Sequence, residues 1–175
     1  MTTKILNLGC GNDFYGTDRI DICKTPATTK VWDIDNKKLP YPNEYFDEIF
    51  CKSVIEHMRN LGNFIKECYR VLKKGGKLYV RTDYSGYLPV HIGYRYEHNR
   101  SLYYAHQSSE DHHYHHFTES HLRYLFKSFK IKNIKLIYGG GNPIKNFICR
   151  ILPKRLGVVH LDLYASKSIK EGKSK

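Results

Sequence analysis

The sequence has no closely paired cysteines and no apolar run long enough to cross a membrane. Its five cysteines form no C-x-x-C pair, which argues against a zinc site built from them. Their odd number, together with the absence of a signal-peptide pattern, favours a reducing compartment. We therefore expect a cytoplasmic protein. No internal repeat or linker is visible, and 175 residues fit one domain with a real hydrophobic core.

Acidic residues are scarce relative to basic ones. The chain has 29 Lys and Arg against 17 Asp and Glu, which gives a net charge of +12. This excess favours anionic partners such as nucleic acid, phosphorylated metabolites or acidic membrane surfaces, although scattered lysines also serve solubility. The lysines concentrate at the end of the chain, in "SKSIKEGKSK". We predict a single domain over residues 1–167 and a basic disordered tail over residues 168–175.

The stretch "KILNLGCGND" runs from an apolar segment into two glycines, Gly9 and Gly11. Glycine permits backbone angles that other residues avoid, and it lets a ligand approach the main chain. A buried strand followed by such a turn forms nucleotide pockets in α/β proteins, although a tight turn without a function also fits this short motif. The next glycine is Gly16 and the next strand ends at Asp21, which is too early for the fingerprint of a dinucleotide-binding dehydrogenase.

Strand and helix patterns alternate early in the chain, and strands close it. Strands are predicted at residues 4–9, 17–22, 29–34, 46–53, 77–83, 131–138 and 158–166. Residues 54–74 show helical spacing with an interruption near Gly62, and Lys73 and Lys74 precede a stop at Gly75 and Gly76. Residues 118–129 predict a helix capped by Thr118. This order predicts an α/β fold with a mostly parallel sheet and an antiparallel ending.

Several blocks in order resemble the class I S-adenosylmethionine-dependent methyltransferase family. These are "LNLGCGN", "RIDI", "LPYPNEYFDEI", "VIEHM" and "RVLKKGGKLYV". The resemblance covers about residues 4–83. It implies a Rossmann-like sheet in the order 3-2-1-4-5-7-6, with one antiparallel strand near the C-terminus and helices on both faces. It also implies a methyltransferase enzyme that uses S-adenosylmethionine.

Carried over to this chain, the resemblance implies a cofactor pocket at the ends of the first, second and fourth strands. Gly9, Cys10 and Gly11 would lie under the methionine and ribose, and Asp21 would accept hydrogen bonds from the ribose hydroxyls. Ile22 would pack on the adenine, while Asp33 and the backbone of Ile34 would bind its polar edge. Ser53 would lie beside the reactive methyl. For Asp21 and Asp33, ordinary capping of a strand end is the alternative interpretation.

The chain departs from the family pattern at two places. Asn7 stands where the family usually has Asp or Glu, so a contact toward the methionine amino group is weakened or mediated by water. Only about eight residues separate Gly11 from the strand at Ile20, whereas a crossover helix needs roughly a dozen. We therefore expect the first helix to be missing or reduced to a turn.

Methyl transfer to a hydroxyl or ammonium group needs a base, and four residues are candidates for the catalytic site. His57 and Asp83 follow the fourth and fifth strands, and His113 and His116 belong to "AHQSSEDHHYHHF". For His57, hydrogen bonding at a helix start is the alternative; for the histidine cluster, the alternatives are surface histidines without a role and a metal site. The cluster matches no metal-ligand frame, so we predict no metal. Related enzymes carry a substrate-covering insert here, which predicts such an insert at residues 84–117.

These features favour a methyltransferase acting on an unidentified, anionic acceptor, and a small molecule is favoured over nucleic acid. The alternative is a non-catalytic nucleic-acid-binding module that keeps the methyltransferase fold, because tyrosines interleaved with basic residues suit base stacking. Gly9, Gly11, Asp21 and Asp33 argue against that alternative, since a pure binding module has no need of them. The sequence does not predict the acceptor atom or the oligomeric state.

Overall fold

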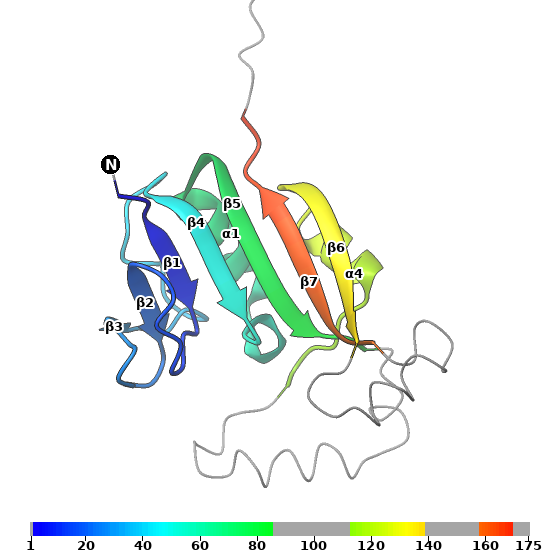
Figure 1. The fold of residues 1–175 in the computed structure, drawn as a ribbon, viewed down its shortest axis with the longest axis horizontal. Helices are drawn as coiled ribbons and strands as arrows, with labels where there is room; N and C mark the ends of the chain where they lie inside the picture. The colour runs from blue at the N-terminus through cyan, green and yellow to red at the C-terminus, as the bar shows by residue number, and fades with distance from the viewer. Residues whose placement is uncertain (1, 86–112, 139–157, 170–175) are drawn as a thin grey trace, which may run out of the picture.

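The computed structural model describes residues 2–85, 113–138 and 158–169 (Figure 1). These residues form one seven-stranded sheet in the order β3-β2-β1-β4-β5-β7-β6, which confirms the predicted fold and strand order. The strands are β1 (Ile5–Leu8), β2 (Asp18–Asp21), β3 (Lys30–Val31), β4 (Phe46–Lys52), β5 (Leu72–Asp83), β6 (Lys130–Tyr138) and β7 (Val158–Ser166).

Strands β3, β2, β1, β4 and β5 are parallel, and β7 is antiparallel to both β5 and β6. The carboxyl ends of β1, β2, β4 and β5 therefore meet at one edge of the sheet, where α/β proteins bind ligands. Because β7 runs the other way, its first residues lie at that same edge (Figure 1). This edge is called the carboxyl edge below.

The helices cover one face of the sheet. They are η1 (Ile55–His57), α1 (Leu61–Val71) and α4 (Glu119–Leu125), and α1 and α4 both lie behind the sheet in Figure 1. The ring centroids of Tyr69 on α1 and Phe129 after α4 are 5.1 Å apart, so the two helices meet over this face. Alternate residues of the central strands, such as Ile49, Leu78 and Leu163, are buried on the same side and form the core.

The predicted helix of residues 54–74 is divided and ends earlier than expected. Its break lies at residues 58–60, before Gly62, where Asn60 caps α1 by accepting a hydrogen bond from Asn63 N. The helix ends at Val71, and the backbone is already extended at Leu72. The prediction that Lys73 and Lys74 form the helix end is wrong, because they belong to β5. The predicted cap of α4 is confirmed, since Thr118 Oγ1 accepts from His121 N.

No helix connects β1 to β2, as the short spacing predicts. Residues 9–17 form turns and bends, with Gly9, Gly11 and Gly16 at positive φ. Within the described ranges, a helix is found only on the face that α1 and α4 cover, and not on both faces as expected. The opposite face is called the open face below.

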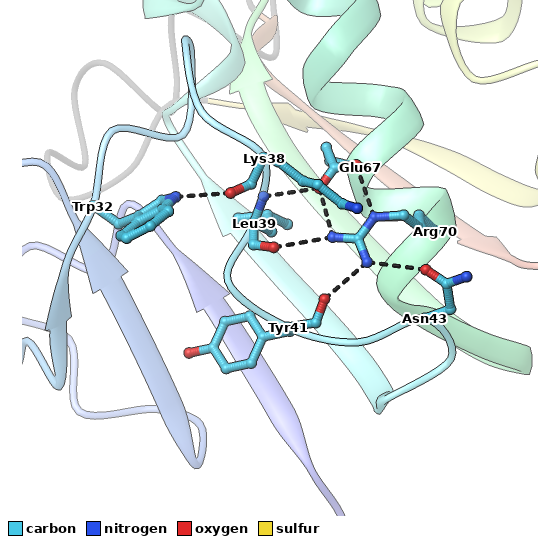
Figure 2. A network of polar contacts seen from close by, with 7 residues as sticks. All are labelled: Trp32, Lys38, Leu39, Tyr41, Asn43, Glu67 and Arg70. Carbon is cyan, nitrogen blue, oxygen red and sulfur yellow. Dashed lines mark hydrogen bonds and ion pairs between the residues drawn. The ribbon is translucent and has the colours of Figure 1, made fainter.

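The loop between β3 and β4 is held by an ion pair instead of a crossover helix (Figure 2). Arg70 and Glu67 on α1 are joined by a 2.6 Å contact between Nη2 and Oε2. Glu67 accepts from Leu39 N, and Arg70 donates to the carbonyl oxygens of Leu39 and Tyr41. The hydrogen bonds to Arg70 hold the pKa of Glu67 below its ordinary value despite burial. The ion pair thereby fixes the path of the chain from β3 to β4.

Candidate functional site

The loop after β1 crosses the carboxyl edge in a conformation that needs glycine. Gly9 N and Cys10 N both donate to the carbonyl oxygen of Ile20 at the end of β2. Gly9 has a φ of 64°, and a Cβ placed there would lie 2.3 Å from Cγ2 of Val54. Gly11 has a φ of 51°, and a Cβ there would meet no other atom within 4 Å. Gly9 is thus required by the protein's own packing, whereas the space above Gly11 is open.

Asp21, at the end of β2, faces this loop. Its Oδ2 accepts a hydrogen bond from Gly11 N at 2.7 Å, and its Oδ1 accepts one from Cys23 N at 3.0 Å. An ionised carboxylate offers about four acceptor positions, so two remain for the hydroxyls of a ribose. The next residue, Ile22, is 65% exposed, and a large apolar side chain at such an edge suits a flat aromatic ligand.

Threonines from the β2–β3 connection hold the glycine loop from below. Thr25 Oγ1 donates to the carbonyl oxygen of Gly11, and Thr28 Oγ1 lies 2.8 Å from Thr25 Oγ1. Thr28 also contacts the buried Cys10 thiol at 3.7 Å. Burial raises the pKa of Cys10, so its thiol stays protonated and acts as a small apolar group. Sequence reasoning missed these threonines, since "KTPATT" carries only a turn signal.

Asp33 is held mainly by its own loop. Its Oδ1 accepts from the backbone nitrogens of Asp35 and Asn36, and its Oδ2 accepts from the Asn36 side chain at 3.0 Å. Although burial opposes the effect, these hydrogen bonds lower the pKa of Asp33. The contacts fit the capping interpretation, and they leave about one acceptor position for an adenine amino group. Ile34 is buried, so only its backbone is suited to reading a ligand.

Two further predicted cofactor residues flank the glycine loop. Ser53 directly follows β4, is exposed, and has an unusual φ of 53°. Its backbone N donates to the carbonyl oxygen of Arg81. Asn7 is buried on β1 and donates to the carbonyl oxygen of Tyr15. Asn7 therefore stabilises the loop of residues 9–17, and its expected role toward the methionine stays a prediction.

A second group of polar side chains gathers at the carboxyl ends of β4 and β5. Asp83, the last residue of β5, lies 3.0 Å from His160 Nδ1 through Oδ1 and 3.4 Å from His113 Nδ1 through Oδ2. The rings of His113 and His57 meet edge to face, with centroids 4.5 Å apart. Three of the four predicted catalytic residues are therefore brought together at Asp83. His116 is farther away, 6.3 Å from His113 between ring centroids.

The histidine segment is anchored by backbone hydrogen bonds to the turn after β4. Tyr114 N and His115 N both donate to the carbonyl oxygen of Glu56. The Glu56 side chain is fully buried and accepts from Thr82 Oγ1 at 2.9 Å. Ser85 N also donates to the carbonyl oxygen of Phe117, beside the bridge between Tyr84 and Phe117. These contacts bring residues 113–117 to the carboxyl edge.

His160 was missed by sequence reasoning. It is the direct partner of Asp83 in the pairing of β5 with β7. The signal lay in "VVHLDLYAS", because an antiparallel strand beside β5 puts its first polar residue next to the last residue of β5. Arg59 was missed as well: its Nη2 donates to Tyr114 Oη at 2.7 Å, and its guanidinium lies 5.0 Å from that ring.

Part of the predicted site lies outside the described residues. This applies to residues 86–112, which make up most of the predicted insert at residues 84–117, and to residues 170–175 of the predicted tail. The domain bounds and the compartment stay predictions. In the described ranges, no group of three or more His, Cys, Asp and Glu side chains is arranged to hold a metal ion. Likewise, no helix there has the length and apolar character needed to span a bilayer.

A family model described as "Methyltransferase domain" matches residues 15–80. A mitochondrial ubiquinone biosynthesis O-methyltransferase of Rattus norvegicus is 49% identical over 39 residues, which are 22% of this chain and 11% of that protein. The crystal structure of an S-adenosylmethionine-dependent methyltransferase from Methanosarcina mazei matches with a TM-score of 0.61 and 17% identity, over 97% of this chain and 95% of the other. The [4+2]-cyclase SpnF matches with a TM-score of 0.61 and 15% identity, over 95% and 75%.

The solved structures show the Rossmann-like methyltransferase fold, and the family model adds the class of the domain. Residues 15–80 are similar to this methyltransferase domain family, and the described sheet has the methyltransferase fold. S-adenosylmethionine is the methyl donor that this family implies. The residues present fit such a ligand: open space above Gly11, acceptor positions on Asp21, and the exposed Ile22. The chain spans about a tenth of the length of the rat relative.

Proposed function

We propose that this chain transfers the methyl group of S-adenosylmethionine to a small anionic acceptor held beside Asp83. The observation that carries the proposal is that two groups of polar residues lie at the same carboxyl edge. The first group is Gly11, after β1, with Asp21 at the end of β2. The second group, called the Asp83 cluster below, is Asp83 at the end of β5 with His160 near the start of β7, His113 and His57. Gly11, Asp21 and Ile22 would hold the cofactor, whose sulfonium supplies an electrophilic methyl when bound.

The Asp83 cluster is suited to holding and moving a proton. When Nδ1–H of His160 donates a hydrogen bond to Asp83, the Nε2 atom of the ring carries a free lone pair. This lone pair can accept a proton from an acceptor hydroxyl. The Asp83 carboxylate stabilises the imidazolium that forms. His113 has the same relationship to the other oxygen of Asp83, at a longer distance. The histidine would hold the proton taken from the acceptor hydroxyl, and the acceptor oxygen would then be able to accept the methyl that the cofactor would supply.

Charge supports an anionic acceptor. The chain carries a net charge of +12, and the exposed Arg59 follows η1 near His57. An acceptor with a carboxylate or phosphate would meet a guanidinium, which forms strong paired hydrogen bonds with such groups. Arg59 already contacts Tyr114, so the phenol fixes the orientation of the guanidinium.

Calorimetry with S-adenosylmethionine and S-adenosylhomocysteine tests the cofactor half of the proposal. Asp21→Ala should weaken binding by about 1.5–3 kcal/mol, the scale for a hydrogen bond to a charged group. The matched control is Glu119→Ala, which removes an exposed carboxylate on α4 that pairs with Arg123. Equal affinity of the Asp21→Ala variant and the wild type would remove Asp21 from the binding site.

The acceptor half needs a transfer assay. Methyl-labelled S-adenosylmethionine is incubated with fractions of small anionic metabolites and, separately, with RNA and protein. Label in a small anionic product that disappears in the Asp83→Asn variant supports the proposal. Label only in macromolecules would contradict the small-molecule acceptor, even if cofactor binding is normal.

A further inference from the structure

A row of aromatic rings crosses the open face of the sheet. Phe50 pairs with Tyr79, and Tyr79 pairs with Tyr164, so the three side chains project from β4, β5 and β7 in one line. Their ring centroids are 4.8 and 5.2 Å apart. Tyr15, from the loop between β1 and β2, extends the row, 5.0 Å from Phe50. Because strand residues alternate, these rings point away from the core that α1 and α4 cover.

Cations flank this row on both sides. The strand register places exposed lysines of the open face in the two rows of residues on either side of the rings. Lys77 and Lys130 lie in one row, and Lys52 and Lys135 lie in the other. Lys135 Nζ lies 5.1 Å from the Tyr164 centroid. Among the described residues next to the rings, the carboxylates are Glu48, which accepts from Tyr15 Oη, and Asp162, which is paired with Arg81 at 2.6 Å. Asp83 projects from β5 to the same side, but it lies at the carboxyl end of the strand beside His160. The face is therefore cationic.

The row ends in exposed rings. Phe14 is 64% exposed and Tyr15 is 42% exposed. The guanidinium of Arg19 lies 5.9 Å from the Phe14 ring. Both aromatic residues belong to residues 9–17, which take the place of a crossover helix. Large exposed rings beside cations mark a surface that binds a partner.

We propose that the open face binds single-stranded nucleic acid, with bases stacking on Phe14 and Tyr15 and phosphates following the lysines. Every base offers a π-face, so stacking on exposed rings needs no sequence preference, and lysines along the path neutralise the backbone. A second copy of the chain is a less suitable partner for the open face, because two cationic faces would repel each other. This surface shares the loop of residues 9–17 with the cofactor site but extends across the open face, and the proposal goes beyond the proposed function.

Fluorescence anisotropy with a fluorescein-labelled, mixed-sequence 12-nucleotide RNA tests the proposal on the whole chain. Each contacted phosphate of a single strand contributes about −0.7 to the slope of log K against log salt. Contacts from three or four lysines predict a slope of about −2 to −3. The Phe14→Leu/Tyr15→Leu variant should bind about tenfold more weakly or worse. The Lys52→Gln/Lys135→Gln variant should reduce the size of the slope by about 1.4.

The matched control is a cation and ring pair at the end of α4, on the other face of the sheet: Tyr124 belongs to α4 and Lys127 follows it. Lys127 Nζ lies 4.5 Å from the Tyr124 ring, and Tyr124 is 69% exposed. Tyr124→Leu/Lys127→Gln should bind RNA like the wild type. Equal weakening by the control and the open-face variants, or absence of RNA binding at low salt, would overturn the proposal.

Two further measurements separate this proposal from others. Asp21→Ala should bind the RNA normally, so a failure of cofactor binding leaves this proposal intact. Sedimentation of the wild type and of Phe14→Leu/Tyr15→Leu addresses the second-copy alternative. A dimer that the double variant abolishes would overturn the nucleic-acid proposal, whereas a monomer in both cases supports it.

Discussion

His160 Nδ1 lies 3.0 Å from Asp83 Oδ1, across two strands that run in opposite directions. The contact joins the last residue of β5 to an early residue of β7. It gives the carboxyl edge a carboxylate and imidazole pair that needs no loop to hold it. A pair fixed by two central strands keeps its geometry when neighbouring loops move.

If this pair takes the acceptor proton, His160→Gln should lower turnover by about 10²–10⁴-fold, the scale of general base catalysis. Affinity for S-adenosylmethionine should stay unchanged. His116→Ala should reduce turnover less than His113→Ala, because His113 Nδ1 lies 3.4 Å from Asp83, whereas the His116 ring is 6.3 Å from the His113 ring. The assay is the labelled-methyl transfer, with His121→Gln on the exposed side of α4 as the control. Normal turnover of both His160→Gln and His113→Ala would mean that the reaction uses no base from this cluster.

Much of the sheet could be predicted from sequence, because its signals are local. The apolar strands, the glycine turn after β1 and the Thr118 cap depend on nearby residues, and β7 was predicted with its observed bounds. The short spacing between Gly11 and Ile20 also ruled out a helix by length alone. The family resemblance supplied the strand order, which local patterns do not contain.

The errors arose where distant contacts override local patterns. Lys73, Lys74, Gly75 and Gly76 resemble a helix end, yet pairing of β5 with β4 extends the strand back to Leu72. His160 could not be identified as a site residue without knowing that β7 lies beside Asp83. The Glu67–Arg70 pair replaces a missing crossover helix with contacts to Leu39 and Tyr41, about 30 residues away in the chain.

Acid should weaken the contribution of Glu67 to stability. Because its hydrogen bonds to Arg70 lower its pKa in the folded state, the contribution is complete above the ordinary Glu value. It is lost as the pH falls through the lower, folded value. At pH 7, Glu67→Gln should reduce the free energy of unfolding by about 3 kcal/mol, the scale for breaking a buried ion pair.

Urea denaturation between pH 7 and pH 3 measures this effect. The difference between the wild type and Glu67→Gln should shrink below about pH 4.5. Asp33 and Asp47 also have lowered pKa values, but they titrate in both proteins and cancel in the difference. A difference that stays constant over this range would show that the Glu67 charge adds nothing beyond packing.

Gly9 and Gly11 should respond differently to the same substitution. A Cβ on Gly9 would lie 2.3 Å from Val54 Cγ2, so Gly9→Ala forces the core beside β4 to shift. We expect a loss of about 1–3 kcal/mol in the free energy of unfolding without any ligand.

In Gly11→Ala, the new Cβ meets no atom within 4 Å, so the free energy of unfolding should fall by only about 1–2 kcal/mol because of the positive φ. Its Cβ would instead occupy the space assigned to the cofactor, so affinity for S-adenosylmethionine should fall at least tenfold. Urea denaturation and calorimetry on both variants separate the effects, and Gly9→Ala/Val54→Ala should recover part of the stability lost in Gly9→Ala. Normal cofactor affinity of Gly11→Ala would show that the ligand does not pass over this loop.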